Sequence, residues 1–152
     1  MLIGFSGGGD STALLQAACE AASKTGKACL AGVIDHGLRD GSAADAATAA
    51  AVARSLGAEP VIVTLSGLAG GQANARLARH VALCAIARQA GAGAILLGHT
   101  EDDLAETVLM RLAGGAGPRG LAAMGGVDWS PLWPQGRGQR AGRPFSRLPR
   151  EA

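Results

Sequence analysis

Phe5-Ser6-Gly7-Gly8-Gly9-Asp10-Ser11 follows a short apolar run and leads directly into a stretch with helical periodicity. The run predicts one short strand over residues 1–5. After the glycines, apolar residues recur at three- and four-residue steps, as on the buried face of a helix: Leu14, Leu15, Ala18, Cys19 and Ala22. A glycine-rich turn between a strand and a helix presents backbone N–H groups at the positive end of the helix dipole. The segment therefore predicts a site for phosphate or pyrophosphate.

The spacing of these glycines excludes the two commonest nucleotide loops. The segment lacks a terminal Gly-Lys-Ser/Thr, and its glycines are consecutive, unlike those of dinucleotide-binding folds. A simpler alternative is a tight turn in which Asp10 or Ser11 caps the helix. Three glycines are more than a cap requires, which favours the anion site.

Composition limits the function classes. A chain of 152 residues is ordinarily one domain, and a net charge of +2 argues against general binding to nucleic acids. The three cysteines form no CxxC pair, so neither a disulfide framework nor a zinc site is predicted. The sequence shows no apolar run of membrane-spanning length and no cleavable leader, so we expect a cytoplasmic protein with no membrane partner.

Strand and helix signals alternate along the chain. Strands are expected at residues 1–5, 28–34, 60–65 and 94–98, and helices at 11–24, 42–56, 72–90 and 101–113, with Ser42 as a helix cap. This alternation predicts an α/β fold, a Rossmann-like parallel sheet with helices on both faces. Residues 1–124 are expected to form this α/β domain. Residues 125–152 are expected to be a Gly/Pro/Arg-rich tail, poorly ordered or truncated, with at most one edge strand near 129–133.

Three further polar segments follow or flank these elements. Asp35-His36-Gly37-Leu38-Arg39 could hold a ribose, an amine or a phosphate, or be an ordinary solvated turn. Arg76, Arg79 and His80 share one edge of the third helix, a solvated face in the simplest interpretation. The core stripe of that helix is expected at Leu77, Val81, Cys84 and Ala85.

The segment from His99 to Thr107 is acidic. Asp102, Asp103 and Glu106 lie on one side of the first turns of the expected helix, where they either complement the helix dipole or bind a cation such as Mg²⁺ or a substrate ammonium. In a parallel sheet, ligands bind beyond the carboxyl ends of the strands. Because Ser6–Ser11, Asp35–Arg39 and His99–Glu106 all follow strands, their agreement predicts one shared site.

Together and in this order, these segments resemble the amino-terminal catalytic domain of the tRNA(Ile)-lysidine synthetases, in the ATP pyrophosphatase (PP-loop) superfamily with its adenine nucleotide alpha hydrolase-like fold. The family's SGGxDS, DHGLR, ARxxRY and HHxDDxxET segments, and its glycine loop ending near GLxxM, match residues 6–11, 35–39, 76–80, 99–107 and 115–124. The glycine loop alone identifies only the superfamily. The complete set, at matching spacings, is specific.

The resemblance implies an ATP-dependent ligase that forms a carbon–nitrogen bond. The C2 oxygen of the wobble cytidine of isoleucine tRNA would attack the α-phosphate of ATP, and the ε-amine of free L-lysine would then displace AMP to give lysidine. By the same resemblance Ser6, Gly7, Gly8, Gly9, Asp10 and Ser11 would bind ATP, and Asp10 would orient it with Mg²⁺. Arg79 would neutralise charge at the reacting phosphate, and Asp103 and Glu106 would hold lysine. The remaining substrate-binding candidates are His36, Arg39 and Asp102.

The chain departs from the family pattern at three positions. Thr100 replaces a second histidine, His80 replaces a tyrosine, and Gly114 replaces the arginine of an RGxG loop. Family members also continue with regions that grip the tRNA, so this chain is expected to be a catalytic domain alone. Two alternatives stay open: a related PP-loop tRNA-thiolating enzyme, and a truncated nucleotide-binding module without catalysis. A homodimer is also left open.

Overall fold

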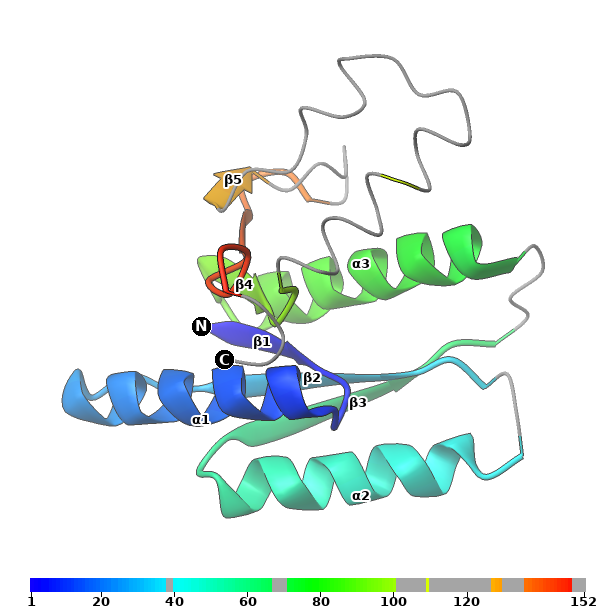
Figure 1. Cartoon of the computed structure of the whole chain (residues 1–152), viewed down its shortest axis with the longest axis horizontal. Helices are drawn as coiled ribbons and strands as arrows, with labels where there is room; N and C mark the ends of the chain where they lie inside the picture. The colour runs from blue at the N-terminus through cyan, green and yellow to red at the C-terminus, as the bar shows by residue number, and fades with distance from the viewer. Residues whose placement is uncertain (38–39, 67–70, 101–108, 110–126, 130–135, 149–152) are drawn as a thin grey trace.

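The computed structural model describes residues 1–37, 40–66, 71–100, 109, 127–129 and 136–148 (Figure 1). In chain order its elements are β1 (Leu2–Phe5), α1 (Gly9–Lys24), β2 (Leu30–Asp35), α2 (Ser42–Ser55), β3 (Glu59–Thr64), α3 (Gly71–Gln89), β4 (Ala94–Leu97), β5 (Val127–Trp129) and β6 (Arg140–Gly142). Within these ranges, no helix has the length and apolar character that crossing a membrane would require. The expected strand–helix alternation up to residue 98 is confirmed, with boundaries shifted by at most two residues.

The strands form one sheet in the order β3-β2-β1-β4-β6-β5. All neighbours pair in parallel except β5, which runs antiparallel to β6 at the edge of the sheet. Leu2 of β1 pairs with Leu30 of β2 on one side and with Ile95 of β4 on the other, so the strand order reverses at β1. In open sheets of this kind, ligands bind beyond the carboxyl ends of the strands at the reversal. The predicted Rossmann-like α/β fold is confirmed.

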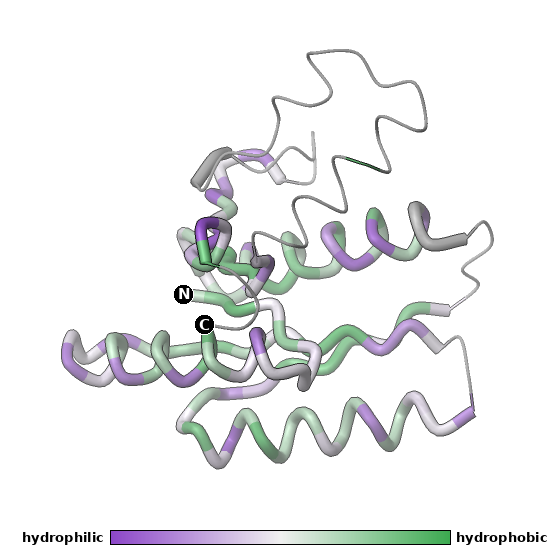
Figure 2. Tube along the Cα trace, viewed as in Figure 1, coloured by the Kyte–Doolittle hydropathy of each residue, from purple (hydrophilic) through white to green (hydrophobic). Residues whose placement is uncertain are grey.

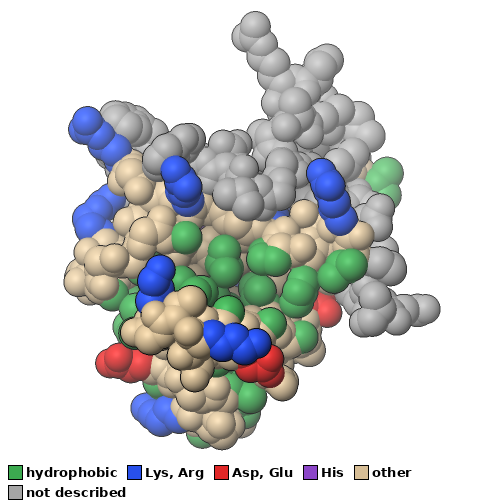
Figure 3. Space-filling model, turned by 90° about the vertical axis from the view of Figure 1, so that its left-hand side faces the viewer, with side chains coloured by type: hydrophobic (Ala, Val, Ile, Leu, Met, Phe, Trp, Pro, Cys, Tyr) green, Lys and Arg blue, Asp and Glu red, His purple; other side chains and the backbone are tan. Residues whose placement is uncertain are grey.

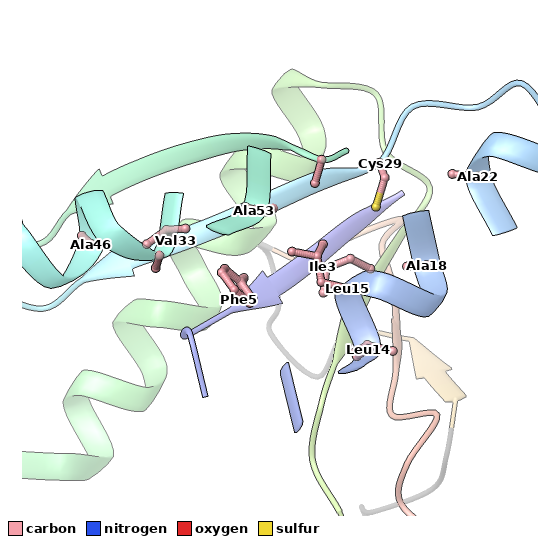
Figure 4. Close-up of a cluster of buried hydrophobic side chains, with 13 residues drawn as sticks. Ile3, Phe5, Leu14, Leu15, Ala18, Ala22, Cys29, Val33, Ala46 and Ala53 are labelled. Carbon is pink, nitrogen blue, oxygen red and sulfur yellow. The ribbon is translucent and has the colours of Figure 1, made fainter. Parts of the chain in front are cut away.

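Helices cover both faces of the sheet, as predicted. Successive side chains of a strand point to opposite faces, so β1 contributes to two cores. Ile3 and Phe5 pack with α1 and α2 on one face (Figure 4), whereas Leu2 packs with α3 on the other. Figure 2 shows β1 coloured as mainly hydrophobic and the helices alternating between hydrophobic and hydrophilic residues, as one-sided burial requires.

Close approach of α3 to the sheet depends on two glycines. A Cβ at Gly32 would lie 2.6 Å from Cδ2 of Leu83, and one at Gly4 would lie 3.2 Å from Cδ1 of the same leucine. Leu83 is 1% exposed, so these strand glycines make room for its side chain. Because α3 runs antiparallel to the strands, Arg79, one turn before Leu83, is brought towards the carboxyl edge of the sheet.

The core stripe predicted for α3 is partly wrong. Leu77 is 51% exposed, and Ala85 is exposed as well. The buried face is formed instead by Leu83, Cys84, Ile86 and Ala87. Spacing alone can assign the buried face of a helix to positions one residue away from the true ones. In α3, the space left by the strand glycines determines which face packs against the sheet.

The carboxy-terminal region also differs from the expectation of at most one edge strand near residues 129–133. Two strands are present, β5 and β6, and β6 pairs in parallel with β4, Ala94 opposite Arg140. Ala141 is 7% exposed, so this part of the expected tail belongs to the sheet. The expected helix over 101–113 lies outside the described residues except for Leu109.

The opposite edge of the sheet, where the strands begin, carries charged side chains of both signs. Figure 3 views this side and shows Lys and Arg side chains around an apolar area, together with Asp and Glu side chains. α1, α2 and α3 end here, and each has a basic residue in its last turn: Lys24, Arg54 and Arg88. Cations at helix carboxyl termini complement the helix dipoles, so these three are explained without a ligand.

Candidate active site

A cleft of about 840 Å³ opens at the carboxyl ends of β1, β2 and β4. Its walls bring together three of the segments singled out in the sequence, represented by the glycine turn after β1, Asp35 with His36 after β2, and His99 after β4. Arg79 and Leu83 of α3 also line the cleft, as do residues of the first two turns of α2 and the ends of the three strands. The described residues of these segments therefore line one cleft, and their role as one ligand site stays a prediction.

The glycine turn is held by its own two serines. Oγ of Ser11 donates to the carbonyl of Gly8 at 2.9 Å and lies 3.2 Å from Oγ of Ser6. Gly7 has a φ of +81°, a conformation that disfavours any other residue. α1 begins at Gly9, and no side chain caps its amino terminus. The alternative in which Asp10 or Ser11 caps the helix is therefore wrong, and the start of α1 faces the cleft as an anion site would.

Gly98, the first residue after β4, lies directly against the start of α1. A Cβ on Gly98 would lie 3.1 Å from the carbonyl carbon and oxygen of Asp10 and from the nitrogen of Ser11. This contact fixes how far the glycine turn stands from β4 across the cleft. This role of Gly98 was not predicted from the sequence, where a glycine at the end of a strand is its only signal.

Asp35, the last residue of β2, stabilises the turn that follows the strand. Its Oδ1 accepts a hydrogen bond from N–H of Gly37 at 2.9 Å, and the pKa of Asp35 is lowered by that bond first and by the Ser42 side chain second. Gly37 has a φ of +60°, and a Cβ there would lie 2.9 Å from the carbonyl oxygen of Leu65. Asp35 therefore stays ionised and holds the end of β2. Arg39 lies outside the described residues.

The simplest interpretation of the sequence placed Arg79 on a solvated helix face, and this is wrong. Arg79 is half-buried at the cleft wall, and burial first, with the charge of Arg76 second, lowers the pKa of its guanidinium. Its Nε is buried and has no hydrogen-bond partner within the described residues. A cation held in this way has capacity left for an anionic ligand.

His36 lines the same wall from the end of β2. Burial, followed by the charge of Arg79, lowers its pKa, and the neighbouring Asp35 opposes the shift. Nδ1 of His36 is buried without a hydrogen-bond partner among the described residues. The imidazole is therefore neutral near neutral pH.

His80, which follows Arg79 on α3, is strongly perturbed. Burial first, and then the charges of Arg79, Arg76, His99 and Arg143, lower its pKa to about 4. Arg143 follows β6, so this positive cluster joins α3 with the carboxyl ends of β4 and β6. The part of the chain expected to be a tail thus contributes a charge beside the cleft.

Two polar residues of α2, Ser42 and Asp45, line the cleft without having been predicted as site residues from the sequence. Ser42 was predicted to cap this helix, but the N-cap is Gly41, with a φ of +87°, and Ser42 is the first helical residue. Its side chain hydrogen-bonds Asp35 instead. Asp45, in the first turn of α2, also lines the cleft.

The described residues contain no group of three or more His, Cys, Asp or Glu side chains that could hold a metal ion. Mg²⁺ does not require such a cage, because it is usually bound by one or two carboxylates together with substrate phosphates. Asp10 lies in the first turn of α1 and lines the cleft, so it fits this requirement. Asp102, Asp103 and Glu106 lie outside the described residues.

The cysteines lie away from the cleft lining. Cys29 is buried near the start of β2, and Cys19 packs against the same core cluster. Burial, followed by a hydrogen bond with Cys19, raises the pKa of Cys29 to about 12. The sequence showed no paired cysteines, whereas the fold brings these two together. The two free thiols lie at the opposite end of the sheet from the cleft. The raised pKa keeps the Cys29 thiol protonated.

The family model described as "PP-loop domain" matches residues 1–152. The chain belongs to the PP-loop family. Curated relatives extend this likeness: "tRNA(Ile)-lysidine synthase" of Salinispora tropica is 49% identical over 133 residues, 85% of this chain and 40% of that protein. The protein of the same name from Hyphomonas neptunium is 41% identical over 150 residues, 99% of this chain and 41% of the relative. This PP-loop chain spans about two fifths of the length of the curated relatives it matches.

A solved structure supports the same fold for this PP-loop domain. The "U34-tRNA thiolase NcsA from Methanococcus maripaludis" matches with a TM-score of 0.79 at 20% identity, over 99% of this chain and 52% of that one. At this identity the likeness establishes the fold and no further property.

Proposed function

We propose that this chain carries the catalytic domain of a tRNA(Ile)-lysidine synthetase. It would use ATP to adenylate the wobble cytidine of isoleucine tRNA and then join free L-lysine to that base. The observation that carries the proposal is the uncapped start of α1 facing a cleft that also holds the half-buried Arg79. The similarity to curated lysidine synthases over most of this chain supports the choice of substrates.

In the first step, the backbone N–H groups of Gly7–Ser11 would hold the pyrophosphate part of ATP. Asp10 would orient it together with Mg²⁺, which adds positive charge near the departing pyrophosphate. The cytidine C2 oxygen forms a bond to the α-phosphorus while the bond to pyrophosphate breaks. Arg79 would stabilise the charge that develops on the α-phosphate oxygens.

In the second step, the ε-amine of lysine attacks C2 of the activated base and AMP leaves with the electron pair of the broken bond. Asp103 and Glu106 would hold the lysine and favour loss of a proton from its ammonium group. His36, Arg39 and Asp102 would contact the substrates. A tRNA substrate places this activity in the cytoplasm.

The thiolating alternative is favoured only by the fold it shares with the tRNA thiolase. Thiolating relatives commonly use paired cysteines at the site. Here Cys19 and Cys29 lie together as free thiols outside the described cleft lining. The non-catalytic alternative, a nucleotide-binding module, differs from the proposed enzyme in that it would bind ATP without turning it over.

The deciding experiment incubates the chain with α-labelled ATP, Mg²⁺, L-lysine and isoleucine tRNA. Labelled AMP released together with lysidine in the RNA is the expected result. Thiocytidine on addition of a sulfur donor would establish the alternative enzyme. ATP binding without release of AMP or pyrophosphate would show a nucleotide-binding module.

A further inference from the structure

His36 and Arg79 present an unusual combination at one wall of the cleft. They come from different elements, the end of β2 and the middle of α3, yet the charge of Arg79 acts on the imidazole. Each has a buried nitrogen without a hydrogen-bond partner in the described part of the chain, Nδ1 in His36 and Nε in Arg79. Buried polar atoms are seldom left in this state, so the pair calls for an explanation.

The positive charge of Arg79 selects one form of the imidazole. A guanidinium favours an unshared electron pair over an N–H group on a nearby ring nitrogen. Nδ1 is the ring nitrogen that is buried without a partner among the described residues, so it would carry the electron pair and the proton of the neutral ring would reside on Nε2. His36 would then have a single N–H donor for a ligand, on Nε2.

The partner of this donor is inferred from the cleft that it shares with the glycine turn. β1 and β2 are parallel neighbours, so the turn after Phe5 and His36 after β2 both lie at the carboxyl edge of the sheet, and both line the cleft. The turn after Phe5 would take the pyrophosphate of ATP. The α-phosphate, one phosphate further along, would then lie towards the wall that holds Arg79 and His36.

We infer that His36, as a neutral ring, donates a hydrogen bond from Nε2 to a non-bridging oxygen of the ATP α-phosphate during adenylation. This inference rests on the proposed function. The cytidine C2 oxygen bonds to phosphorus, pyrophosphate leaves with the electron pair, and negative charge is retained on the non-bridging oxygens. No proton passes through His36.

The charged groups around His36 suit a donor better than a base. Arg79 on α3 disfavours a second proton, whereas Asp35 on β2 favours one, and burial tips the balance towards the neutral ring. A neutral imidazole can act as a hydrogen-bond donor to developing negative charge, an arrangement known from other enzymes. Removing one donor of this kind from a polar transition-state site commonly costs about 100-fold or more in rate.

Three variants separate a donor from a base. His36→Gln places an amide N–H near the position of Nε2, His36→Asn keeps the amide but lacks the reach, and His36→Ala removes both. Pyrophosphate release from ATP with isoleucine tRNA and no lysine is measured in a single turnover across pH 5.5–8.5. We expect His36→Gln to stay within about tenfold of wild type with an unchanged pH profile, and the other two to lose about 100-fold.

Circular dichroism and thermal melting of each variant verify folding. Equal loss of activity in all three folded variants would show that His36 acts as a base. So would a fall in the wild-type rate at acidic pH that is missing from the pH profile of His36→Gln. Either result overturns the inference. Wild-type rates in His36→Ala would overturn it as well. Absence of pyrophosphate release in the wild-type chain would count against the proposed function, and the inference is then decided by a second measurement.

That measurement uses the wild-type chain and needs no turnover. The chain has three histidines, and in ¹⁵N-histidine spectra the signal missing from His36→Gln assigns residue 36. We expect an Nε2–H tautomer whose Nε2 shift moves on addition of α,β-methylene-ATP with Mg²⁺, and does not move with pyrophosphate alone. An Nδ1–H tautomer, or a shift unaffected by the nucleotide, would overturn the inference.

Discussion

Gly98 lies against the backbone of Asp10, so close that a Cβ on Gly98 would lie 3.1 Å from the carbonyl carbon and oxygen of Asp10. The contact joins the carboxyl end of β4 to the first turn of α1 across the strand-order reversal at β1. Both partners at this point are backbone atoms, which cannot turn aside as the end of a side chain can. The glycine turn is thereby held at a fixed distance from the opposite side of the cleft.

Replacing Gly98 with alanine should therefore displace the start of α1 and weaken ATP binding by about tenfold, which corresponds to roughly 1.4 kcal/mol. Titration calorimetry with Mg²⁺–ATP measures the loss. Gly93→Ala is the matched control, because a Cβ at Gly93, just before β4, meets no atom within 4 Å. Equal affinities in the two variants would show that this contact does not position the loop.

Replacing Asp10 with alanine should abolish Mg²⁺-dependent nucleotide binding or turnover, because the variant lacks the carboxylate proposed to orient the pyrophosphate with Mg²⁺. The fold should persist, since Asp10 lies partly exposed at the cleft. Affinity for ATP with and without Mg²⁺ is the measurement. Asp40→Ala removes an exposed carboxylate outside the described cleft lining and should leave both values unchanged. Unchanged ATP affinity and turnover in Asp10→Ala would remove the basis for the site.

Replacing Glu106 with alanine should impair the lysine-dependent step more than adenylation, because Glu106 is proposed to hold the amine. A single-turnover assay should show adenylated RNA accumulating, with the second step slowed about 100-fold. Glu106→Gln controls for the loss of charge alone. Equal loss of both steps would assign the carboxylate to ATP or metal, and no loss would leave it as a residue that complements the helix dipole.

His80 should make the free energy of unfolding depend on pH. Its pKa is about 4 in the folded chain against an ordinary value of 6.5, so between these values the unfolded chain binds the proton and the folded chain does not. The contribution of His80 to the free energy of unfolding is then fully present above pH 6.5. It decreases by roughly 1–3 kcal/mol as the pH drops towards 4. Urea denaturation at several pH values measures this.

His80→Gln should flatten the dependence, with the lowered pKa of His36 responsible for a remaining slope of the same sign. An identical pH dependence in wild type and His80→Gln would contradict the assignment.

This 152-residue chain should bind isoleucine tRNA weakly and with little selectivity. Phosphate contacts supply most of the affinity of proteins for RNA, yet the net charge is only +2 and Gly114 stands in place of an arginine. Dissociation constants near the nonspecific range of about 10⁻⁴ to 10⁻⁶ M are expected, rising steeply with salt. Filter binding against a second tRNA at several salt concentrations tests this. Tight, selective binding at physiological salt would contradict it.

The sequence by itself determined the order of the elements up to β4 and the nature of the loop after β1. Local signals were sufficient there, because apolar runs, helical periodicity and consecutive glycines each act within a few residues. The same local pattern located Asp35 and His36 at the end of a strand and Asp10 at the start of a helix. The rule that ligands bind beyond the carboxyl ends of parallel strands then predicted one shared cleft.

Only the tertiary structure decided which faces and partners these elements use. β6 has three residues, Arg140, Ala141 and Gly142, too few to show a period, and it becomes a strand because β4 offers it a free edge. The inward face of α3 depends on strand glycines that are distant in sequence, so Leu83 is buried where spacing had suggested Leu77. Rotation of that helix also places Arg79 beside His36. The influence of Arg79 on the pKa of His36 arises from the packing of α3 against the sheet, which no local pattern encodes.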